Sequence, residues 1–378
     1  MGAPPPPSDR AGTRPGARLG RERGNSMDFS LFYFANDSAE QGDAGRYELM
    51  IEGARFADAH GFTAVWTPER HFHQFGGLYP NPAVTGAALA AVTERVRIRA
   101  GSVVAPLHHP LRIAEDWSVI DNLSGGRAGV SFASGWHPVD FAIRPEAHAD
   151  RKEALTRTVR DVRRLWRGES ITTPDGNGAD AEVRIFPPAV QPELPCWITS
   201  AGSVETFRTA GELNAGILTH LLGQDLATLT GKIAAYRESL RAHHGPHAPG
   251  HVVLMLHTFL GEDTEAVREL VRAPLSGYLK SSFGLISGTI APRAGSFDRN
   301  SIEDTDVDYL VERGFQRFFD RQGMFGTVER GLAVVERLEE AGVDEVGCLI
   351  DFGVHPKTVL ESLAYLDDVR RRSAARAG

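Results

Sequence analysis

Cysteine is scarce in this chain, and the scarcity excludes two kinds of protein. Cys196 and Cys348 are the only cysteines among 378 residues, and both stand in apolar runs. Two cysteines cannot build a disulfide framework or a zinc site of four thiolates. We therefore expect both to be small core residues in a reducing, cytoplasmic compartment.

Long apolar runs and an excess of positive charge are also missing. No run approaches the roughly 20 apolar residues that cross a bilayer, so a membrane protein is not expected. Lys and Arg number 41 against 49 Asp and Glu, and the formal net charge is −8, whereas a dedicated nucleic-acid binder is usually basic. Hydrophobic residues make up 42% and charged residues 24% of the chain, a globular composition that supports a real core.

The first 26 residues differ from the rest in composition. A run of prolines at positions 4–7 precedes several arginines separated by glycine and other small residues. The segment lacks the apolar centre of a secretory signal and has too little apolar surface to order itself. We expect either a disordered extension over residues 1–26 or a physiological start at Met27.

Strand-like and helix-like segments alternate from residue 27 to residue 372, and residues 373–378 form a tail. Eight strands are predicted at residues 28–34, 63–66, 96–104, 128–133, 196–199, 216–219, 252–260 and 345–351. Helices are predicted between and after them. This alternation is typical of a (β/α)8 TIM barrel, and a doubly wound sheet is the alternative.

Two segments interrupt the alternation. Residues 168–194 are rich in Gly, Asp and Pro and predict a surface hairpin. Residues 272–326 are too long for an ordinary connection. Long insertions beyond barrel strands often act as lids, but a packing arm for an oligomer explains the segment equally well. Its aromatic residues are Phe283, Tyr309, Phe315, Phe318 and Phe319.

Polar residues gather where the predicted strands end, which is where the reactive groups of a barrel lie. The second strand runs into residues 69–73 (Glu-Arg-His-Phe-His), the fourth into 134–137 (Ser-Gly-Trp-His) and the fifth into 200–203 (Ser-Ala-Gly-Ser). The last stretch opens a helix, whose free N–H groups can hold a phosphate. An ordinary N-cap explains Ser203 equally well.

A metal site at His71 and His73 is a further alternative. Two histidines two residues apart can both ligate zinc, and His220, His257 and Asp351 could complete a set. The pair follows the second strand, however, and His257 lies inside a predicted strand. We therefore assign no metal site and keep a metal-dependent barrel hydrolase as an alternative function.

Four blocks of the sequence together resemble the bacterial luciferase family. Residues 67–82 (TPERHFHQFGGLYPNP) resemble the Glu-His-His-Phe…Asn-Pro stretch of luciferase α-subunits, and residues 106–127 look like the most recognisable block of the superfamily. Residues 135–141 and 324–329 continue the resemblance, which spans nearly all of 27–372. The first block is most similar to atypical flavin monooxygenases associated with polyketide and nonribosomal peptide biosynthesis.

The resemblance implies a luciferase-like barrel that uses reduced FMN and O2, with the FMN phosphate near the loop after the fifth strand. It also implies a non-proline cis peptide near residues 102–104. Ser134 stands where luciferase has a flavin-contacting arginine. The cofactor-binding candidates are Glu69, Ser102, Val103, Ser134, Trp136, Ser200, Ala201, Gly202, Ser203 and Thr206.

Four residues are the catalytic candidates. Arg70 occupies the position of the luciferase catalytic histidine, which argues against light emission, and it can stabilise an anionic flavin without losing its charge. His71 is the first candidate for proton transfer, because imidazole titrates near neutrality. His73 and His137 are second choices. Trp136 could shield the site, although core packing explains it equally well.

We expect a two-component FMN-dependent monooxygenase that acts on a small molecule or on an acyl or aminoacyl group tethered to a carrier protein, by hydroxylation rather than Baeyer–Villiger insertion. A separate reductase would supply FMNH2, because no Gly-x-Gly-x-x-Gly motif marks a second nucleotide-binding domain. A deazaflavin-dependent enzyme of the same fold and a non-catalytic flavin-binding protein are alternatives. The resemblance implies a homodimer, and a helix rich in small residues at 82–93 would permit close packing, although packing against its own barrel explains that composition too.

Overall fold

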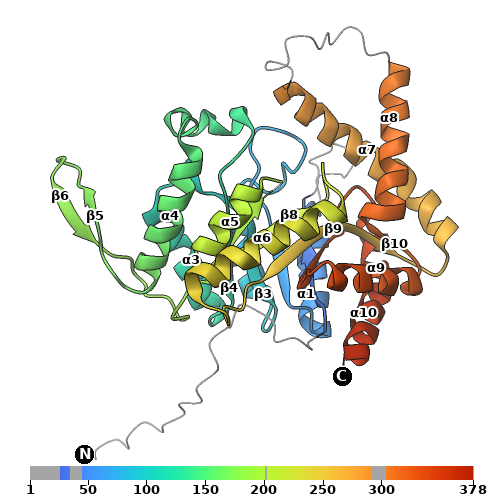
Figure 1. The fold of residues 1–378 in the computed structure, drawn as a ribbon, viewed down its shortest axis with the longest axis horizontal. Coiled ribbons are helices and arrows are strands. Elements are labelled where there is room, and N and C mark those ends of the chain that lie inside the picture. The colour runs from blue at the N-terminus through green and yellow to red at the C-terminus, as the bar shows by residue number, and fades with distance from the viewer. Residues whose placement is uncertain (1–25, 35–44, 201, 291–303, 378) are drawn as a thin grey trace, which may run out of the picture.

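Eight parallel strands form the centre of the computed structural model, which describes residues 26–34, 45–200, 202–290 and 304–377 (Figure 1). The expected extension over residues 1–26 therefore lies almost wholly outside the described residues. The barrel strands are β1 (Asp28–Phe32), β2 (Ala64–Thr67), β3 (Arg97–Val104), β4 (Ala128–Ala133), β7 (Cys196–Ser200), β8 (Gly216–His220), β9 (Val252–Leu260) and β11 (Glu345–Leu349).

The strands pair in the order β1-β2-β3-β4-β7-β8-β9-β11, and β11 pairs with β1 again, so the sheet closes. The predicted (β/α)8 barrel is confirmed, and the doubly wound alternative is wrong because an open sheet would leave two unpaired edges. A short strand that the sequence did not suggest, β10 (Met324–Gly326), extends the pairing of β9.

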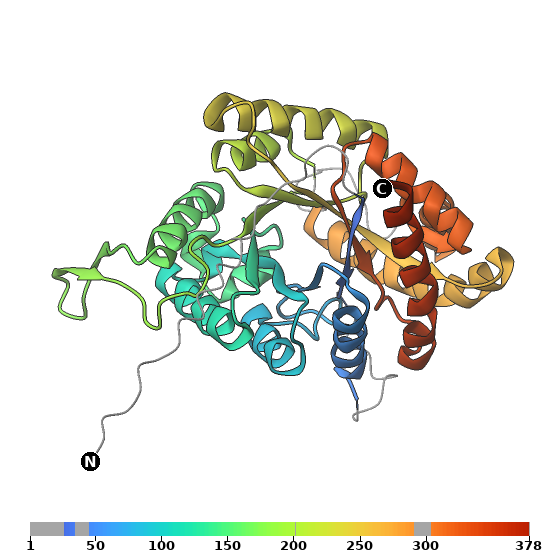
Figure 2. The same ribbon diagram turned by 90° about the horizontal axis from the view of Figure 1, so that it is seen from below.

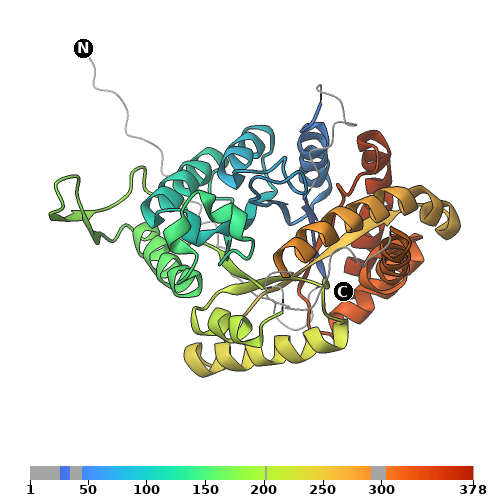
Figure 3. The same ribbon diagram turned by 90° about the horizontal axis from the view of Figure 1, so that it is seen from above.

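Helices form an outer layer around these strands (Figures 2 and 3). They are α1 (Glu48–His60), α2 (Pro82–Val92), α3 (Pro110–Ser124), α4 (Arg151–Trp166), α5 (Val204–Glu212), α6 (Leu226–His244), α7 (Thr264–Ile290), α8 (Asp304–Arg317), α9 (Val328–Glu340) and α10 (Pro356–Ala377). Along the described parts of the chain, no helix has both the length and the apolar character that a membrane crossing requires.

Local signals account for where these helices begin and end. Asn81 caps α2 by accepting hydrogen bonds from the Ala83 and Val84 N–H groups, and Pro82 follows at the first helical position. Gly61 ends α1 in the left-handed conformation, with φ 76°. Helix α4 begins at Arg151, shortly after a 3₁₀ turn (Pro145–Ala147).

Toward the amino ends of its strands, the barrel interior holds a buried ion pair between two tryptophans. Arg99 Nη1 donates to Glu345 Oε1 and Oε2 at 3.0 and 2.8 Å. The guanidinium lies 4.9 Å from the ring centre of Trp66 and 4.5 Å from that of Trp197. Burial raises the pKa of Glu345, but Arg99 and His251 outweigh it and hold the pKa below its usual value. The glutamate is therefore ionised in the core.

The segment 168–194 contains the hairpin of β5 (Ile171–Pro174) and β6 (Asp180–Val183), which projects from the barrel in Figure 1. Asp121, near the end of α3, binds the segment that follows this hairpin. The carboxylate accepts from the N–H groups of Val190 and Gln191 at 2.8 and 2.9 Å and from Gln191 Nε2 at 2.7 Å. These contacts hold the base of the hairpin against the barrel.

The segment 272–326 contains the end of α7, α8, a π-helical turn (Phe318–Gln322) and β10. Helices α7 and α8 pack against each other, and Arg268 and Arg272 of α7 stack on Phe319 and Phe315. Phe283 and Tyr309 carry no described side chain. Both α7 and the π-helical turn also contact β9, so this segment packs on its own barrel.

Candidate active site

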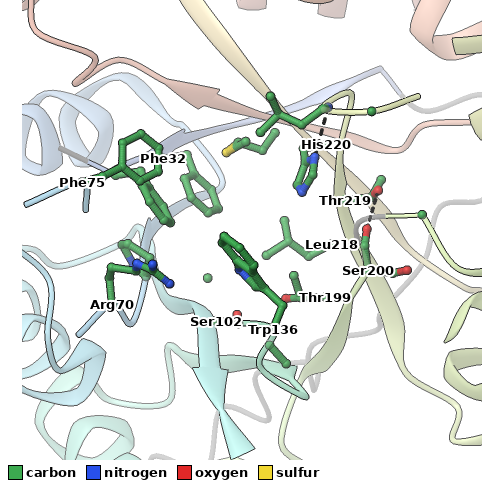
Figure 4. Close-up of a pocket in the computed structure, with 18 of the residues that line it drawn as sticks. Phe32, Arg70, Phe75, Ser102, Trp136, Thr199, Ser200, Leu218, Thr219 and His220 are labelled. Atoms are coloured by element: carbon green, nitrogen blue, oxygen red, sulfur yellow. Dashed lines mark hydrogen bonds between the residues drawn. The ribbon is translucent and has the colours of Figure 1, made fainter. Parts of the chain in front are cut away.

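A cavity of about 1330 Å³ opens at the carboxyl ends of the barrel strands. Figure 4 shows Arg70 and Phe75 on one side of it and Thr219 and His220 on the other. Pockets for one small ligand usually measure about 300–1000 Å³, so this cavity has room for two. Its strand-derived lining includes Phe32, Glu69, Arg70, Gly101, Ser102, Ser134, Thr199, Ser200, Thr219, His220 and Met255.

Arg70 presents unsatisfied donors beside the cavity. Its Nη1 donates to Asp140 Oδ2 at 2.8 Å, and its guanidinium lies 5.3 Å from the ring centre of Trp136. The Nε and Nη2 atoms are buried and have no partner among the described residues. Buried donors are normally satisfied, so these two fit an anionic or acceptor group of a ligand. Burial lowers the pKa of Arg70 and Asp140 opposes that shift, and the guanidinium stays protonated.

Glu69 also lines the cavity and ties three segments together. It accepts from His108 Nε2 at 2.6 Å, from His71 Nε2 at 2.8 Å and from the Val104 N–H at 2.6 Å. Burial raises the pKa of Glu69, but the bonds from His108 and His71 outweigh it and lower the pKa overall. His108 was not singled out from the sequence, because this contact depends on the approach of β2 to β3.

The three histidines expected near the chemistry do not line the cavity. The His71 ring is bound to Glu69, and His73 Nδ1 accepts from the Phe75 N–H at 3.0 Å. His137 Nδ1 lies 3.8 Å from Asp140 Oδ1. Burial, followed by the charges of Arg70 and His73, lowers the pKa of His137 to about 4. Of the four catalytic candidates, Arg70 is the one that the structure brings to the cavity.

The loop after β7 forms a polar end of the cavity. Ser200, Gly202, Ser203 and Thr206 line it, and Ala201 lies outside the described residues. Ser203 precedes α5, and its hydroxyl makes no capping hydrogen bond within the described chain. The alternative explanation of Ser203 as an ordinary N-cap is therefore not supported by a side-chain bond. The hydroxyls and the N–H groups at the start of α5 suit a phosphate.

Lys232 of α6 adds a cation to this end. Its Nζ donates to Gln224 Oε1 at 2.8 Å and lies 3.4 Å from the position that a Cβ on residue 202 would take. The sequence analysis missed Lys232, because no motif connects the middle of α6 with the loop after β7. The contact follows from the close packing of α5 and α6.

The structure at the end of β3 differs from the prediction that Val103 binds the cofactor. The non-proline cis bond joins Gly101 and Ser102, slightly earlier than expected, and the pairing with β4 shifts between Gly101 and Val103. Ser102 and Val104 line the cavity as a result, whereas Val103 is buried in the hydrophobic core. Val103 is therefore not a cavity residue. Gly101 is required here, because a Cβ would lie 2.7 Å from the Phe32 ring.

Trp136 and Ser134 both line the cavity from the loop after β4. Trp136 is 50% exposed, so core packing does not explain it. Phe315, Phe318 and Phe319 of the late insertion are all buried, and of these three Phe318 lines the cavity.

His220 at the end of β8 faces the cavity, although the sequence analysis considered it only as a zinc ligand. Its Nδ1 accepts from the Leu222 N–H at 3.1 Å, so the neutral ring carries its proton on Nε2. Burial lowers the pKa of His220 to about 4. The side chain is therefore an uncharged donor at neutral pH.

The zinc alternative finds no support in these positions. Within the described residues, the three potential ligands whose atoms lie within 4.8 Å of one another are Asp28, His251 and Glu345. These belong to the opposite end of the barrel, where Arg99 already supplies the positive charge beside Glu345. His71, His73, His220, His257 and Asp351 do not form such a group.

His257 below the cavity should make the fold sensitive to acid. It is 2% exposed among the rings of Tyr278, Phe318 and Phe352, and burial, then His220, lowers its pKa to about 3. An unfolded histidine titrates near 6.5, so the unfolded chain binds one more proton below that pH, and stability falls as pH falls. At pH 5 we expect a loss of roughly 2 kcal/mol from this residue.

Urea unfolding of the wild type and of His257→Phe at pH 7 and pH 5 measures this loss. The variant should lose less stability between the two pH values than the wild type does. Equal losses in both proteins would contradict the assignment.

The whole barrel matches one sequence family. The family model described as luciferase-like monooxygenase matches residues 27–370, which include every barrel strand and both walls of the cavity. The chain belongs to the luciferase-like monooxygenase family. The resemblance stated from the sequence is confirmed.

A curated relative in this luciferase-like family carries a flavin enzyme's name. The oxygenase component of the flavin-dependent trigonelline monooxygenase from Acinetobacter baylyi is 28% identical over 251 residues. The match covers 63% of this chain and 66% of that protein. It therefore spans just under two thirds of the relative's length.

Solved structures of other proteins share the luciferase-like fold. The monooxygenase RslO1 from Streptomyces bottropensis superposes with a TM-score of 0.76 at 21% identity, covering 90% of this chain and 98% of that one. The oxygenating constituent of 3,6-diketocamphane monooxygenase from Pseudomonas putida, in complex with FMN, gives 0.70 at 18% identity, with 92% and 98% covered. An F420-dependent secondary alcohol dehydrogenase gives 0.65 at 18% identity, with 91% and 98% covered. At these identities the likeness shows a shared fold.

Proposed function

We propose that this protein is a monooxygenase that uses reduced FMN and O2. The observation that carries the proposal is the unpaired buried Nε and Nη2 of Arg70 in a cavity whose far end suits a phosphate. Reduced FMN combines a phosphate with a ring that is anionic near neutral pH. Its two anionic parts therefore match the two cationic features of the cavity.

The residues present fit this cofactor. Gly202, Ser203 and Thr206 would hold the phosphate, with Lys232 nearby, and Arg70 would face the ring system. When bound, reduced FMN supplies the electrons that activate O2. Phe32 and Trp136 would offer aromatic surfaces that orient the ring and exclude water, and Arg70 would hold a positive charge beside it at Nε and Nη2.

Proton transfer is reassigned in this proposal. His220 offers its Nε2–H directly to the cavity, whereas His71, His73 and His137 do not line it. We therefore propose His220 as the donor of a hydrogen bond to the bound ligands, and His71 as a residue that positions Glu69. Glu69, Ser102 and Ser134 remain cofactor contacts in the proposal because they line the same cavity.

The partners proposed are a separate flavin reductase and a second copy of the chain. The name of the trigonelline relative, an oxygenase component, supports a reductase. Val84, Val119 and Leu123 on α2 and α3 are exposed apolar residues that support a dimer face. Gly86, by contrast, packs against α3, where a Cβ added to it would lie 3.2 Å from the Ile120 side chain. The small residues of α2 are therefore explained in part by packing within the barrel itself. Sedimentation velocity tests the dimer.

The substrate proposed is a small molecule or a carrier-tethered acyl or aminoacyl group, with hydroxylation favoured over Baeyer–Villiger insertion. The size of the cavity supports a substrate beside the flavin. The fold shared with an F420-dependent enzyme supports a second candidate, deazaflavin-dependent hydride transfer.

Anaerobic titration with reduced FMN, and in parallel with reduced F420, tests the proposal. We expect saturable binding of FMN, much weaker binding of riboflavin because it lacks the phosphate, and O2 uptake that a substrate alters. Preference for F420 would favour the deazaflavin candidate. Equal affinity for FMN and riboflavin would overturn the phosphate assignment.

A further inference from the structure

One wall of the cavity carries a row of arginines that the proposed flavin does not use. Arg313 and Arg317 of α8 and Arg321 in the following π-helical turn all line the cavity. They are spaced four residues apart, which places them near one face of a helix. All three are exposed to solvent or to the cavity rather than buried in the protein.

The carboxylates of the same segment, including Asp320, which also lines the cavity, pair with arginines of a different element. Glu312 Oε1 lies 2.9 Å from Arg272 Nη1, and Asp320 Oδ1 lies 2.9 Å from Arg268 Nη2, both on α7. Arg317 and Arg321 form no ion pair with any described residue; Arg317 stacks beside its neighbour Phe318 at 6.0 Å. Glu312 and Asp320 thus bind arginines of α7, whereas Arg317 and Arg321 line the cavity without a carboxylate partner among the described residues.

Apolar side chains surround these cations. Tyr278, Leu279 and Phe318 line the same cavity from α7 and the π-helical turn, and Lys152 at the start of α4 adds another positive charge to its lining. This concentration of cations contrasts with the formal charge of −8 on the whole chain. Cations on a wall that also carries apolar side chains attract an amphiphilic anion.

We propose that Arg317 and Arg321 bind an anionic group of the substrate, so that the substrate is an apolar molecule with a carboxylate or a phosphate ester. The inference rests on the proposed function, because it assigns the FMN phosphate to the start of α5 and leaves α8 for the second ligand. The guanidinium groups suit both anions, since each can bind two oxygens at once.

Calorimetric titration with matched probes tests the charge requirement. The probes are 2-naphthoate and its neutral methyl ester, titrated with and without saturating FMN. We expect the wild type to prefer the carboxylate. Arg317→Gln together with Arg321→Gln should weaken carboxylate binding about fivefold to tenfold and leave the affinities for the ester and for FMN unchanged.

A matched variant controls for the loss of net charge. Arg160→Gln with Arg241→Gln removes two exposed arginines that do not line the cavity, and it should bind both probes like the wild type. An equal loss in this control would overturn the proposal, as would equal affinity of the wild type for the charged and neutral probes. A loss of FMN affinity in the α8 variant would assign these arginines to the flavin and also overturn it.

A second pair of probes separates the two sources of anion. Binding of pantetheine 4′-phosphate in preference to pantetheine, lost in the α8 variant, would support a carrier-derived phosphate ester; the same result for the naphthoate pair would support a free acid. If neither anion is preferred, the proposal is overturned. Failure of FMN to bind would defeat the proposed function alone, because the titrations without FMN still measure the anion site.

Discussion

Replacing Glu345 by glutamine should lower the free energy of unfolding by about 3–5 kcal/mol. The substitution keeps the size of the side chain but leaves the Arg99 guanidinium without a counter-charge in the barrel interior. Glu345 is fully buried and receives bonds from both Arg99 and Trp66. A buried charge without its partner is much less favourable than the intact pair.

Urea unfolding at pH 7 measures the change. The matched control replaces both partners, with Arg99→Met and Glu345→Leu, and should be more stable than Glu345→Gln because no charge is then left unpaired. A Glu345→Gln protein as stable as the wild type would show that Arg99 is solvated or partnered elsewhere.

Replacing Arg70 by methionine should weaken the binding of reduced FMN by about 10-fold to 100-fold. The estimate corresponds to the loss of charge-assisted hydrogen bonds worth roughly 1.5–3 kcal/mol. Oxidised FMN has a neutral ring and should lose less affinity. The reduction potential of bound FMN should therefore fall in the variant, which spectroelectrochemical titration measures without any substrate.

Asp140→Asn controls for the loss of the ion pair at Arg70. It removes the carboxylate that accepts from Arg70 Nη1 but leaves the arginine, so the affinity for reduced FMN should be kept or increased. A fall in affinity as large as that of Arg70→Met would show that the pair acts through the local fold. Arg70→Lys should restore little, because a lysine cannot offer two donors in a plane.

The sequence was sufficient for the fold because each barrel strand is an apolar run closed by a turn signal. All eight predicted strands occur, and their ends differ by a few residues at most. The late insertion was harder, since α7 and α8 depend on contacts such as Arg272 with Glu312 that no local pattern encodes. The three-residue strand β10 is too short to carry a periodic signal.

The site was predictable only in part, for a geometric reason. Arg70 and Ser203 stood in motifs directly after strands, and both line the cavity. Lys232 and Arg317 come from helices whose approach to the cavity is set by packing. Val103 was misplaced because the shift of register at the end of β3 changes which neighbours face inward.

The ion pair of Arg99 and Glu345, between Trp66 and Trp197, also bears on the route by which ligands enter. Because these buried side chains fill the barrel interior toward the amino ends of the strands, molecules reach the cavity from the side where the strands end. The two ligands proposed for the cavity, a flavin and a substrate, would then enter and leave through the same opening.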